Sequence, residues 1–460
     1  MTQADTIAAI ATPPGAAGLG LIRVSGPASA EVGRRLFRPA HKTCPWQSHR
    51  LYHGDLVTAD GKTVLDEVLV ALMRRPHSFT GEDVLEISCH GNPLILEAVL
   101  EQCLRAGCRP ARPGEFSLRA FQNGRLDLAQ AEALAAMISA RSERAWQIGL
   151  AQLKGALGDK LRDVRSLLID ALASLEAAID FSDDIGEEEA PPAPPQIAKA
   201  AKQIESLLAT YRQGRLTTEG IRAVITGKPN VGKSSLLNSL AGRKKAIVTD
   251  IPGTTRDLIT DTLTWNGLLV HLTDTAGIRA PRDIIEKEGI DRVWALLEEA
   301  DVTIILLDGS RPLTDEDRLI MEQNQSRANK TLLVMNKSDL PAAWSPGDLQ
   351  DRIPPGSRML RISAKFGVGL DDLRRAVLEQ AGGRGTDDGD GIIISLRHKL
   401  ALKKALDGLT AALENFRAGR SPEFAAFELH EALDAVDEIT GRKIQDDVLA
   451  KIFSTFCIGK

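Results

Sequence analysis

The sequence predicts a multidomain protein in which a doubly wound α/β domain and an α+β domain are combined with a helical bundle. Three observations lead to this prediction. Short strands punctuated by glycine and proline fill residues 1–120, helical periodicity dominates residues 121–220 and 381–460, and strands alternate with helices over residues 221–380. Because neither helical half alone has enough partners to bury its apolar face, we expect the α/β domain to be inserted into one helical domain.

The composition excludes several classes of protein. At about 150 residues per domain, a chain of 460 residues suggests roughly three domains. The chain has 57 Lys and Arg against 62 Asp and Glu, and this net charge of −5 argues against a generally basic nucleic-acid-binding surface. No basic segment precedes an apolar core at its start, and no apolar run reaches about 18 residues, so we expect a cytoplasmic protein without a membrane partner.

Residues 1–120 contain three apolar runs with strand character, GLGLIRVSG, DEVLVALMRRP and EDVLEISCHG. Residues 93–105 are expected to form a helix after the third run. Strand runs followed by one helix, without alternating βαβ units, indicate an α+β domain and argue against a second nucleotide-binding fold.

Apolar periodicity predicts one long packed helix that ends near residue 179. Its apolar residues are spaced by threes and fours and share one face: Leu150, Leu153, Leu157, Leu161, Val164, Leu168, Leu172, Leu175 and Ile179. Acidic residues at 182–190 and prolines at 191–195 predict a turn, after which residues 197–211 form an antiparallel helix. The helical period returns from about residue 396, and these later helices are expected to pack against the earlier block.

The stretch IRAVITGKPNVGKSSLL, residues 221–237, has the pattern of a buried strand, a glycine-rich loop and a helix. Gly227 and Gly232 allow the backbone to curl so that successive N–H groups face a phosphate, and the dipole of the following helix adds to the attraction. We expect Lys233 to reach the β- and γ-phosphates of a nucleotide and Ser234 to bind magnesium. The alternative, a plain glycine turn, does not explain the Lys and Ser at these positions.

Three further motifs follow at the ends of predicted strands. The first motif consists of Asp274, Thr275, Ala276 and Gly277. The Asp274 carboxylate can hold magnesium through water, and the Gly277 N–H can meet the γ-phosphate. In Asn336, Lys337, Ser338 and Asp339, the last carboxylate can accept both N–H groups on the Watson–Crick edge of guanine, a pair that adenine lacks. Ser363, Ala364 and Lys365 would contact the guanine O6. In this order, the motifs indicate a GTPase.

Two departures from the Ras-like pattern bear on hydrolysis. Ile278 stands where Ras-like GTPases carry the Gln that orients water, so an acid beyond it, Glu286 or Glu288, becomes the candidate unless that segment is a solvated helix start. Asn230 lies within the glycine-rich loop, and its amide oxygen with carbonyl oxygens of the following switch can enclose a monovalent cation. Such a cation would neutralise transition-state charge in place of an arginine finger.

With these residues, the chain closely resembles the family of bacterial tRNA modification GTPases called MnmE or TrmE, among the TrmE-Era-EngA-like GTPases. The similarity covers the whole length: DTIAAIATPPG and GLGLIRVSG near the start, TGED at residues 80–83, ARPGEFSLRAF with LDLAQAEA, GTTRD, and the terminal FCIGK. The last two motifs are highly specific to that family.

The resemblance implies a reaction, cofactors and partners. It implies a homodimer formed through a folate-binding-like amino-terminal domain, GTPase domains that dimerise around potassium, and a heterotetramer with the flavoprotein MnmG. Together with MnmG, such a protein adds a (carboxymethyl)aminomethyl group to C5 of the wobble uridine of certain tRNAs, using 5-formyl- or methylene-tetrahydrofolate as the one-carbon donor. GTP is the substrate of the hydrolase, and magnesium accompanies it.

The family's functional residues fall on matching positions of this chain. Glu286 matches the acid that orients water. The potassium ligands fall on Asn230, Thr249, Ile251 and Thr254, the magnesium ligands on Ser234 and Thr255, and the folate contacts on Arg23, Glu82, Arg125 and Lys460. The expected GTP-binding residues are Asn230, Val231, Gly232, Lys233, Ser234, Ser235, Thr249, Asp250, Ile251, Pro252, Gly253, Thr254, Thr255, Asp274, Thr275, Ala276, Gly277, Asn336, Lys337, Ser338, Asp339, Ser363, Ala364 and Lys365.

The cysteines leave one question of mechanism open. None of the five belongs to a CxxC pair or to an array with zinc-site spacing, so we expect reduced thiols and no structural zinc. Cys457 lies in the terminal motif, where it is either chemically active or a small buried apolar residue.

Two other functions share the GTPase motifs. One is a GTP-dependent scaffold or ribosome-assembly factor, as in the Era-like and EngA-like relatives, and the other is a GTPase with no role in modification. The Era-like and EngA-like relatives lack a folate-like amino-terminal domain and FCIGK. Detection of a tetrahydrofolate in the purified protein would separate them from the modification enzyme.

Overall fold

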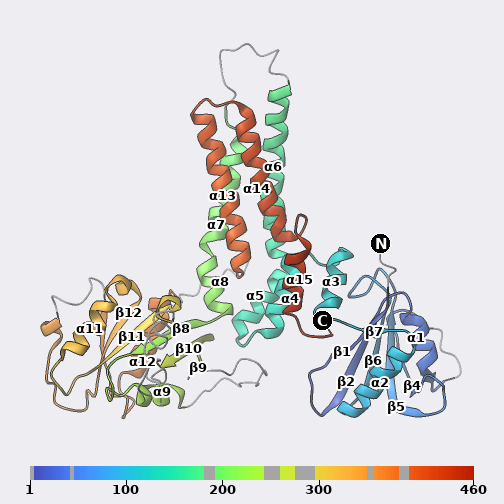
Figure 1. Ribbon diagram of the computed structural model, residues 1–460, viewed down its shortest axis with the longest axis horizontal. Helices are drawn as coiled ribbons and strands as arrows, with labels where there is room; N and C mark the ends of the chain where they lie inside the picture. The colour runs from blue at the N-terminus through green and yellow to red at the C-terminus, as the bar shows by residue number, and fades with distance from the viewer. Residues whose placement is uncertain are drawn as a thin grey trace, which may run out of the picture. The chain divides into compact units, whose positions relative to one another are not determined.

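The computed structural model describes residues 5–41, 46–180, 192–242, 260–274, 296–349, 357–382 and 393–459. These residues fall into two compact units, one drawn from residues 1–135, 152–200 and 404–460 and the other from residues 136–151 and 201–403. Each unit therefore gathers segments that are distant in the sequence (Figure 1). Among the described residues, no helix is both long and apolar enough to cross a membrane.

The amino-terminal part of the first unit is a seven-stranded sheet with the strand order β3-β4-β5-β6-β2-β1-β7. Neighbouring strands are antiparallel, except that β1 and β7 are parallel. The strands are β1 (Ile7–Ile10), β2 (Ala17–Ser25), β3 (Phe37–Pro39), β4 (Leu51–Val57), β5 (Val64–Met73), β6 (Val84–Gly91) and β7 (Arg109–Pro110). The three predicted strand runs correspond to β2, β5 and β6, so their prediction is confirmed.

Helices α1 (Ser29–Leu36) and α2 (Pro93–Arg105) cover one face of this sheet (Figure 1). Alternate residues of β5, such as Val68, Val70 and Leu72, point into this buried face, as a half-buried strand requires. The helix predicted over residues 93–105 is confirmed as α2. It begins there because Asn92 accepts a hydrogen bond from the Leu94 N–H and a proline occupies the first turn.

Helices from both ends of the chain pack together in the first unit. α6 lies along α14 (Figure 1), and Arg165 on α6 pairs with Asp437 on α14 at 2.7 Å. The helices of the first and last helical segments are α3 (Glu115–Gln122), α4 (Leu128–Ser139), α5 (Glu143–Leu153), α6 (Ala156–Asp180), α7 (Pro195–Ala209), α8 (Tyr211–Thr218), α13 (Leu396–Arg417), α14 (Pro422–Thr440) and α15 (Asp446–Ser454). The leucine-rich face of α6 and the apolar face of α14, which carries Leu429, Val436 and Ile439, are both buried, as the periodicity predicted.

The predicted single helix through residues 150–179 is wrong at its start. α5 ends at Leu153 and α6 begins at Ala156, because Gly155 between them has a φ of +99°, a conformation that a helix excludes. The Leu153 carbonyl at the end of α5 accepts a hydrogen bond of 2.9 Å from the Gln130 side chain. The spacing of apolar residues continues across the break because residues of both helices are buried, so periodicity alone did not reveal it.

The second unit contains a six-stranded sheet with the order β13-β12-β11-β8-β10-β9, and only the β9–β10 pair is antiparallel. Its elements are β8 (Ile221–Thr226), α9 (Lys233–Ala241), β9 (Thr260–Trp265), β10 (Leu268–Asp274), β11 (Val302–Asp308), α11 (Asp315–Gln323), the 3₁₀ helix η3 (Gln325–Lys330), β12 (Thr331–Asn336), the 3₁₀ helix η4 (Pro346–Leu349), β13 (Arg358–Arg361) and α12 (Leu370–Ala381). α9 and α12 pack on one face and α11 on the other. This confirms the doubly wound prediction, since strands covered on both faces form continuous apolar runs.

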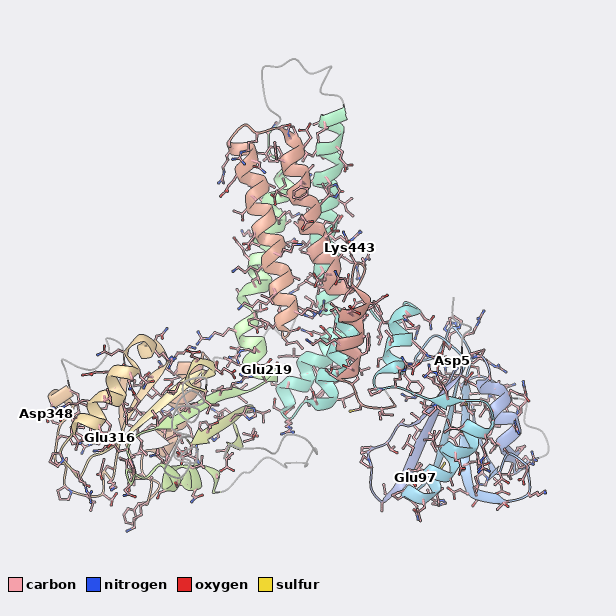
Figure 2. The ribbon with its side chains drawn as sticks, in the orientation of Figure 1. Asp5, Glu97, Glu219, Glu316, Asp348 and Lys443 are labelled. Atoms are coloured by element: carbon pink, nitrogen blue, oxygen red, sulfur yellow. The ribbon has the colours of Figure 1, made fainter. Side chains whose placement is uncertain are left out.

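A group of partly buried charges connects α3 to the amino-terminal sheet, with Arg109 on β7 among them. The Arg119 side chain is 9% exposed, and its guanidinium contacts Asp5 at 2.6 Å, Glu82 at 3.1 Å and Glu115 at 3.1 Å. Arg109 donates a second set of bonds to Asp5 and Glu115. Figure 2 shows Asp5 near α3, where these charges meet. Burial alone raises the pKa of Glu115, but hydrogen bonds from Arg109, the Arg112 N–H and Arg119 outweigh it and lower the pKa from 4.5 to about 2.

We expect Glu115→Gln to destabilise the chain at neutral pH by on the order of 3 kcal/mol, because each unit of pKa difference is worth about 1.4 kcal/mol. Because the pKa of Glu115 is lower in the folded state than in the unfolded state, its charge stabilises the folded chain fully above a pH of 4.5. This stabilisation is lost as the pH falls toward about 2. Urea denaturation from neutral pH down to about pH 3 measures this.

The matched control is Glu101→Gln, because the Glu101 carboxylate is 57% exposed and pairs with an exposed Arg105. It should change the free energy of unfolding by less than about 1 kcal/mol at every pH. A Glu115→Gln penalty that stays constant as the pH falls would contradict the role assigned to the Glu115 charge.

Candidate functional site

The loop of residues 227–232 connects β8 to α9 and passes very close to two other strands of the sheet. A Cβ atom on Gly227, whose φ is +149°, would lie 2.4 Å from the Leu306 carbonyl oxygen. A Cβ atom on Gly232, whose φ is +104°, would lie 2.3 Å from the Asn336 Nδ2. Only glycine fits at both positions, so the loop can curl over the end of the sheet with its N–H groups at the start of α9.

Lys233 and Ser234 lie together at the start of α9. The Lys233 ammonium donates hydrogen bonds of 2.7 Å to the carbonyls of Gly227 and Lys228, and the residue is only 6% exposed. Ser234 Oγ lies 3.5 Å from Asp274 Oδ2 at the end of β10. A cation beside the loop and a hydroxyl beside a buried carboxylate are the groups that bind phosphate and magnesium.

Asn336 connects three loops at the carboxyl edge of the sheet. Its Nδ2 donates a hydrogen bond of 2.8 Å to the Val231 carbonyl, and its Oδ1 accepts one of 2.9 Å from the Ala364 N–H. Asn336 is 2% exposed. The phosphate-binding loop and the Ser363–Lys365 segment predicted to contact guanine are therefore held by one buried amide.

Asp339 lies next to that segment with an exposed side chain. Its Oδ1 accepts a hydrogen bond of 2.6 Å from Ser363 Oγ, and the Ser338 N–H bonds the Ile362 carbonyl at 3.0 Å. The structure thus brings together the two motifs expected to bind the base, with the Asp339 carboxylate accessible to a ligand.

Asp308 lies beside the candidate site, although the motifs did not indicate it. Its Oδ2 lies 2.6 Å from the Lys337 ammonium, and its Oδ1 accepts hydrogen bonds from the N–H and hydroxyl of Ser310. Burial raises the pKa of Asp308, but Lys337 and Ser310 outweigh this effect and lower it, so the carboxylate is charged and orients Lys337. Its position in the sequence could have indicated Asp308, since this residue ends an apolar strand as Asp274 does.

Part of the expected nucleotide site lies outside the described residues. This holds for Thr249, Asp250, Ile251, Pro252, Gly253, Thr254, Thr255, Thr275, Ala276, Gly277 and Glu286. Of the expected potassium ligands, only Asn230 is described, and it is exposed with a φ of +65°.

Arg23, one of the expected folate contacts, lies on β2 of the amino-terminal sheet. Its guanidinium pairs with Glu86 at 2.8 Å and lies 5.5 Å from the Phe79 ring centroid and 5.9 Å from that of Phe116. Its Nη1 also donates a hydrogen bond of 3.2 Å to the Gly459 carbonyl. The last residues of the chain therefore return to the amino-terminal sheet within the first unit.

Glu82 and Arg125 lie at the loop of residues 78–82, which also contains the Phe79 ring beside Arg23. Glu82 accepts a hydrogen bond of 2.7 Å from Ser25 Oγ and contacts Arg119, while the exposed Arg125 donates one of 3.1 Å to the Ser78 carbonyl. The structure gathers three of the four expected residues around one loop. The fourth, Lys460, lies outside the described residues.

The interpretation of Cys457 as a buried apolar residue is wrong, because its thiol is exposed. Its carbonyl accepts a hydrogen bond of 3.4 Å from the Gly114 N–H, and the neighbouring Phe456 supplies the buried side chain at this end of the chain. Cys89, Cys103 and Cys108 are free and buried. Among the residues that the structure describes, no group of three or more His, Cys, Asp and Glu could hold a metal ion.

Comparisons with known proteins cover nearly the whole chain. A family model described as the MnmE helical domain matches residues 128–457, and one described as the GTP-binding protein TrmE N-terminus matches residues 6–125. The tRNA modification GTPase MnmE of Syntrophus aciditrophicus is 46% identical over 460 residues, 99% of each chain. That of Geobacter metallireducens is 44% identical over 463 residues, also 99% of each chain.

One solved structure, the G domain of the T. maritima FeoB iron transporter, matches 35% of this chain and 98% of its own at 27% identity, with a TM-score of 0.28. That score is too low to support a conclusion. The family models and the full-length relatives are sufficient by themselves: the chain belongs to the MnmE family of tRNA modification GTPases.

Proposed function

We propose that this protein is a GTP-hydrolysing tRNA modification enzyme that works with the flavoprotein MnmG. In this proposal it adds a (carboxymethyl)aminomethyl group to C5 of the wobble uridine of certain tRNAs, with a tetrahydrofolate derivative as the one-carbon donor. The observation that supports the GTPase part is the buried Asn336 amide, which joins the phosphate-binding loop to the segment beside Asp339. The tRNA part is supported by the full-length relatives, which are named tRNA modification GTPases.

For GTP, each described motif has a separate role. The loop N–H groups and Lys233 bind the phosphates, and the Asp339 carboxylate accepts the two guanine N–H groups. Ser234, with Asp274 beside it, offers the hard oxygen ligands that magnesium requires, and Thr255 completes the expected set. Magnesium there would neutralise phosphate charge.

Hydrolysis needs a positioned water and a way to neutralise the charge that develops on the phosphates. We assign the orientation of the water to Glu286, since the Ile278 side chain has no hydrogen-bonding group. We assign the neutralisation of the developing charge to a potassium ion held by Asn230, Thr249, Ile251 and Thr254. The described geometry of Asn230 is compatible with this, because its backbone conformation presents an exposed amide at the loop.

The one-carbon site is assigned to Arg23, Glu82, Arg125 and Lys460. A folate has a carboxylate-bearing tail and a pterin with donor and acceptor edges, so it needs cations, one acidic acceptor and an apolar surface. Three of these residues lie around residues 78–82, and the rings of Phe79 and Phe116 lie beside Arg23. The bound folate would supply the transferred carbon.

We propose four segments for the domain organisation: residues 1–120, 121–220, 221–380 and 381–460. The packing of α6 on α14 supports insertion of the GTPase domain into a helical domain made from the second and fourth segments. The amino-terminal segment is proposed to form the homodimer. In this proposal, the protein acts in the cytoplasm as a heterotetramer with MnmG.

If Asp339 selects guanine, Asp339→Asn should weaken GTP binding by at least about tenfold, the size of a lost pair of charged hydrogen bonds, and favour xanthosine triphosphate. Nucleotide titration measures both affinities. The control is Asp371→Asn, which removes an 87% exposed carboxylate from the start of α12 and should leave both unchanged. Unchanged GTP affinity in Asp339→Asn would refute the assignment.

If hydrolysis depends on potassium and Glu286, replacing potassium by sodium should slow turnover with little loss of GTP binding. Glu286→Ala should also reduce the turnover number, by roughly 10²-fold or more, because the water is no longer oriented. Steady-state hydrolysis and GTP titration are measured side by side, with Glu288→Ala as the matched control. Normal hydrolysis by Glu286→Ala would transfer the role to Glu288.

If the carboxyl end completes the one-carbon site, deletion of residues 458–460 should abolish tetrahydrofolate binding and spare GTP hydrolysis, because it removes the Gly459 carbonyl that contacts Arg23 together with Lys460. Mass spectrometry of wobble uridines tests the modification in cells that lack the protein and carry either the full chain or the truncated one. Only the full chain should restore it. Retained folate affinity in the truncated chain would restrict the site to Arg23, Glu82 and their neighbours.

A further inference from the structure

Lys228, the second residue of the phosphate-binding loop, forms an ion pair that no sequence motif indicated. Its ammonium lies 2.6 Å from Asp317 Oδ2 and donates a hydrogen bond of 2.9 Å to Thr314 Oγ1. The side chain of Lys228 is 17% exposed and that of Asp317 is 3% exposed. Salt screens such a pair only weakly, and removal of one charge leaves the other without its counter-charge.

Asp317 is held in place by the first turn of α11. Thr314 caps this helix, and Asp317 Oδ2 accepts hydrogen bonds of 2.9 Å from both the N–H and the hydroxyl of Thr314. The adjacent residue Glu316 marks this end of α11 in Figure 2. Met321, further along α11, packs into the core against β11 and β12. The carboxylate that holds Lys228 therefore belongs to a fixed part of the domain.

The main chain of Lys228 contacts the lysine expected to bind phosphate. Lys233 Nζ donates to the carbonyls of Lys228 and Gly227, each at 2.7 Å. Further along the same loop, the Val231 carbonyl is held by the Asn336 amide. In the described part of the domain, the loop is thus also attached through Asn336, which follows β12, and through the Lys228 side chain, which reaches α11.

We propose that Lys228 is a positioning residue for GTP hydrolysis, acting through its ion pair with Asp317 on the placement of Lys233 and the loop N–H groups. This inference rests on the proposed hydrolysis of GTP at this site. Because a buried carboxylate already neutralises the Lys228 charge, its effect is on loop geometry and not on direct attraction of phosphate. Several N–H groups must be aligned at once to bind a phosphate, so a small displacement of the loop weakens all of them.

The first test uses three variants of the full chain. Lys228→Met keeps the side-chain length and removes the charge, and we expect the Kd values for GTP and GDP to rise by roughly tenfold or more and kcat to fall. Asp317→Asn keeps an oxygen for the helix cap while removing the charge, so a loss of similar size is expected. Lys228→Arg can still pair with Asp317 and should retain most of the affinity. Fluorescence titration with labelled nucleotide and steady-state hydrolysis provide the measurements.

The second test asks whether Lys228 acts through Asp317. The double variant Lys228→Met with Asp317→Asn should lose no more affinity than either single variant, because both remove one interaction. If Lys228 instead bound phosphate directly, Asp317→Asn would leave the affinity unchanged or increase it. The matched control is Asp315→Asn on the same helix, where a 97% exposed carboxylate pairs with Arg318 and its loss should change nothing.

The outcomes separate this inference from the proposed function. If the unmodified chain neither binds nor hydrolyses GTP, the proposed function is wrong. If it does both, wild-type behaviour of Lys228→Met, or additive losses in the double variant, overturns the positioning role alone. Where Lys228→Met fails to fold, as judged by its melting temperature without nucleotide, the contrast between Asp317→Asn and Lys228→Arg decides.

Discussion

The nucleotide site depends on one buried amide. Asn336 ends a central strand, and its two polar atoms bind the Val231 carbonyl and the Ala364 N–H. A side-chain amide is well suited to this position because it both donates and accepts, whereas a carboxylate would face the Val231 carbonyl with no proton to donate. Since an unpaired buried polar group is costly, this arrangement holds the phosphate-binding loop and the segment proposed to bind the base in one fixed relation.

Ion pairs add to this constraint around the candidate site. Lys337 pairs with Asp308, and Lys228 pairs with Asp317, so two lysines of the loops are held by carboxylates from β11 and α11. Both carboxylates are largely buried, and burial makes such pairs geometrically demanding. The domain therefore fixes the positions of its loop lysines before any ligand binds, which lowers the cost of ordering them.

The amino-terminal sheet uses the same principle with a larger group of charges. Arg119 is surrounded by Asp5, Glu82 and Glu115, so the acid assigned to folate is already oriented by a buried cation. The carboxyl end of the chain reaches this region because Gly459, whose φ is +90°, passes very close to Ile10. A Cβ atom on Gly459 would lie 2.6 Å from the Ile10 carbonyl oxygen. Distant parts of the chain thus meet through contacts that only a glycine permits.

The amino-acid sequence by itself determined the elements whose signal is local. Apolar runs punctuated by glycine and proline identified β2, β5 and β6, and glycine spacing identified the phosphate-binding loop, because apolar patterns and turn chemistry are properties of neighbouring residues. Tertiary structure alone decided the break at Gly155, the exposure of Cys457 and the partners of Lys228 and Asp308. These depend on which groups from distant segments face each other, and a side chain's residue type does not specify its partner.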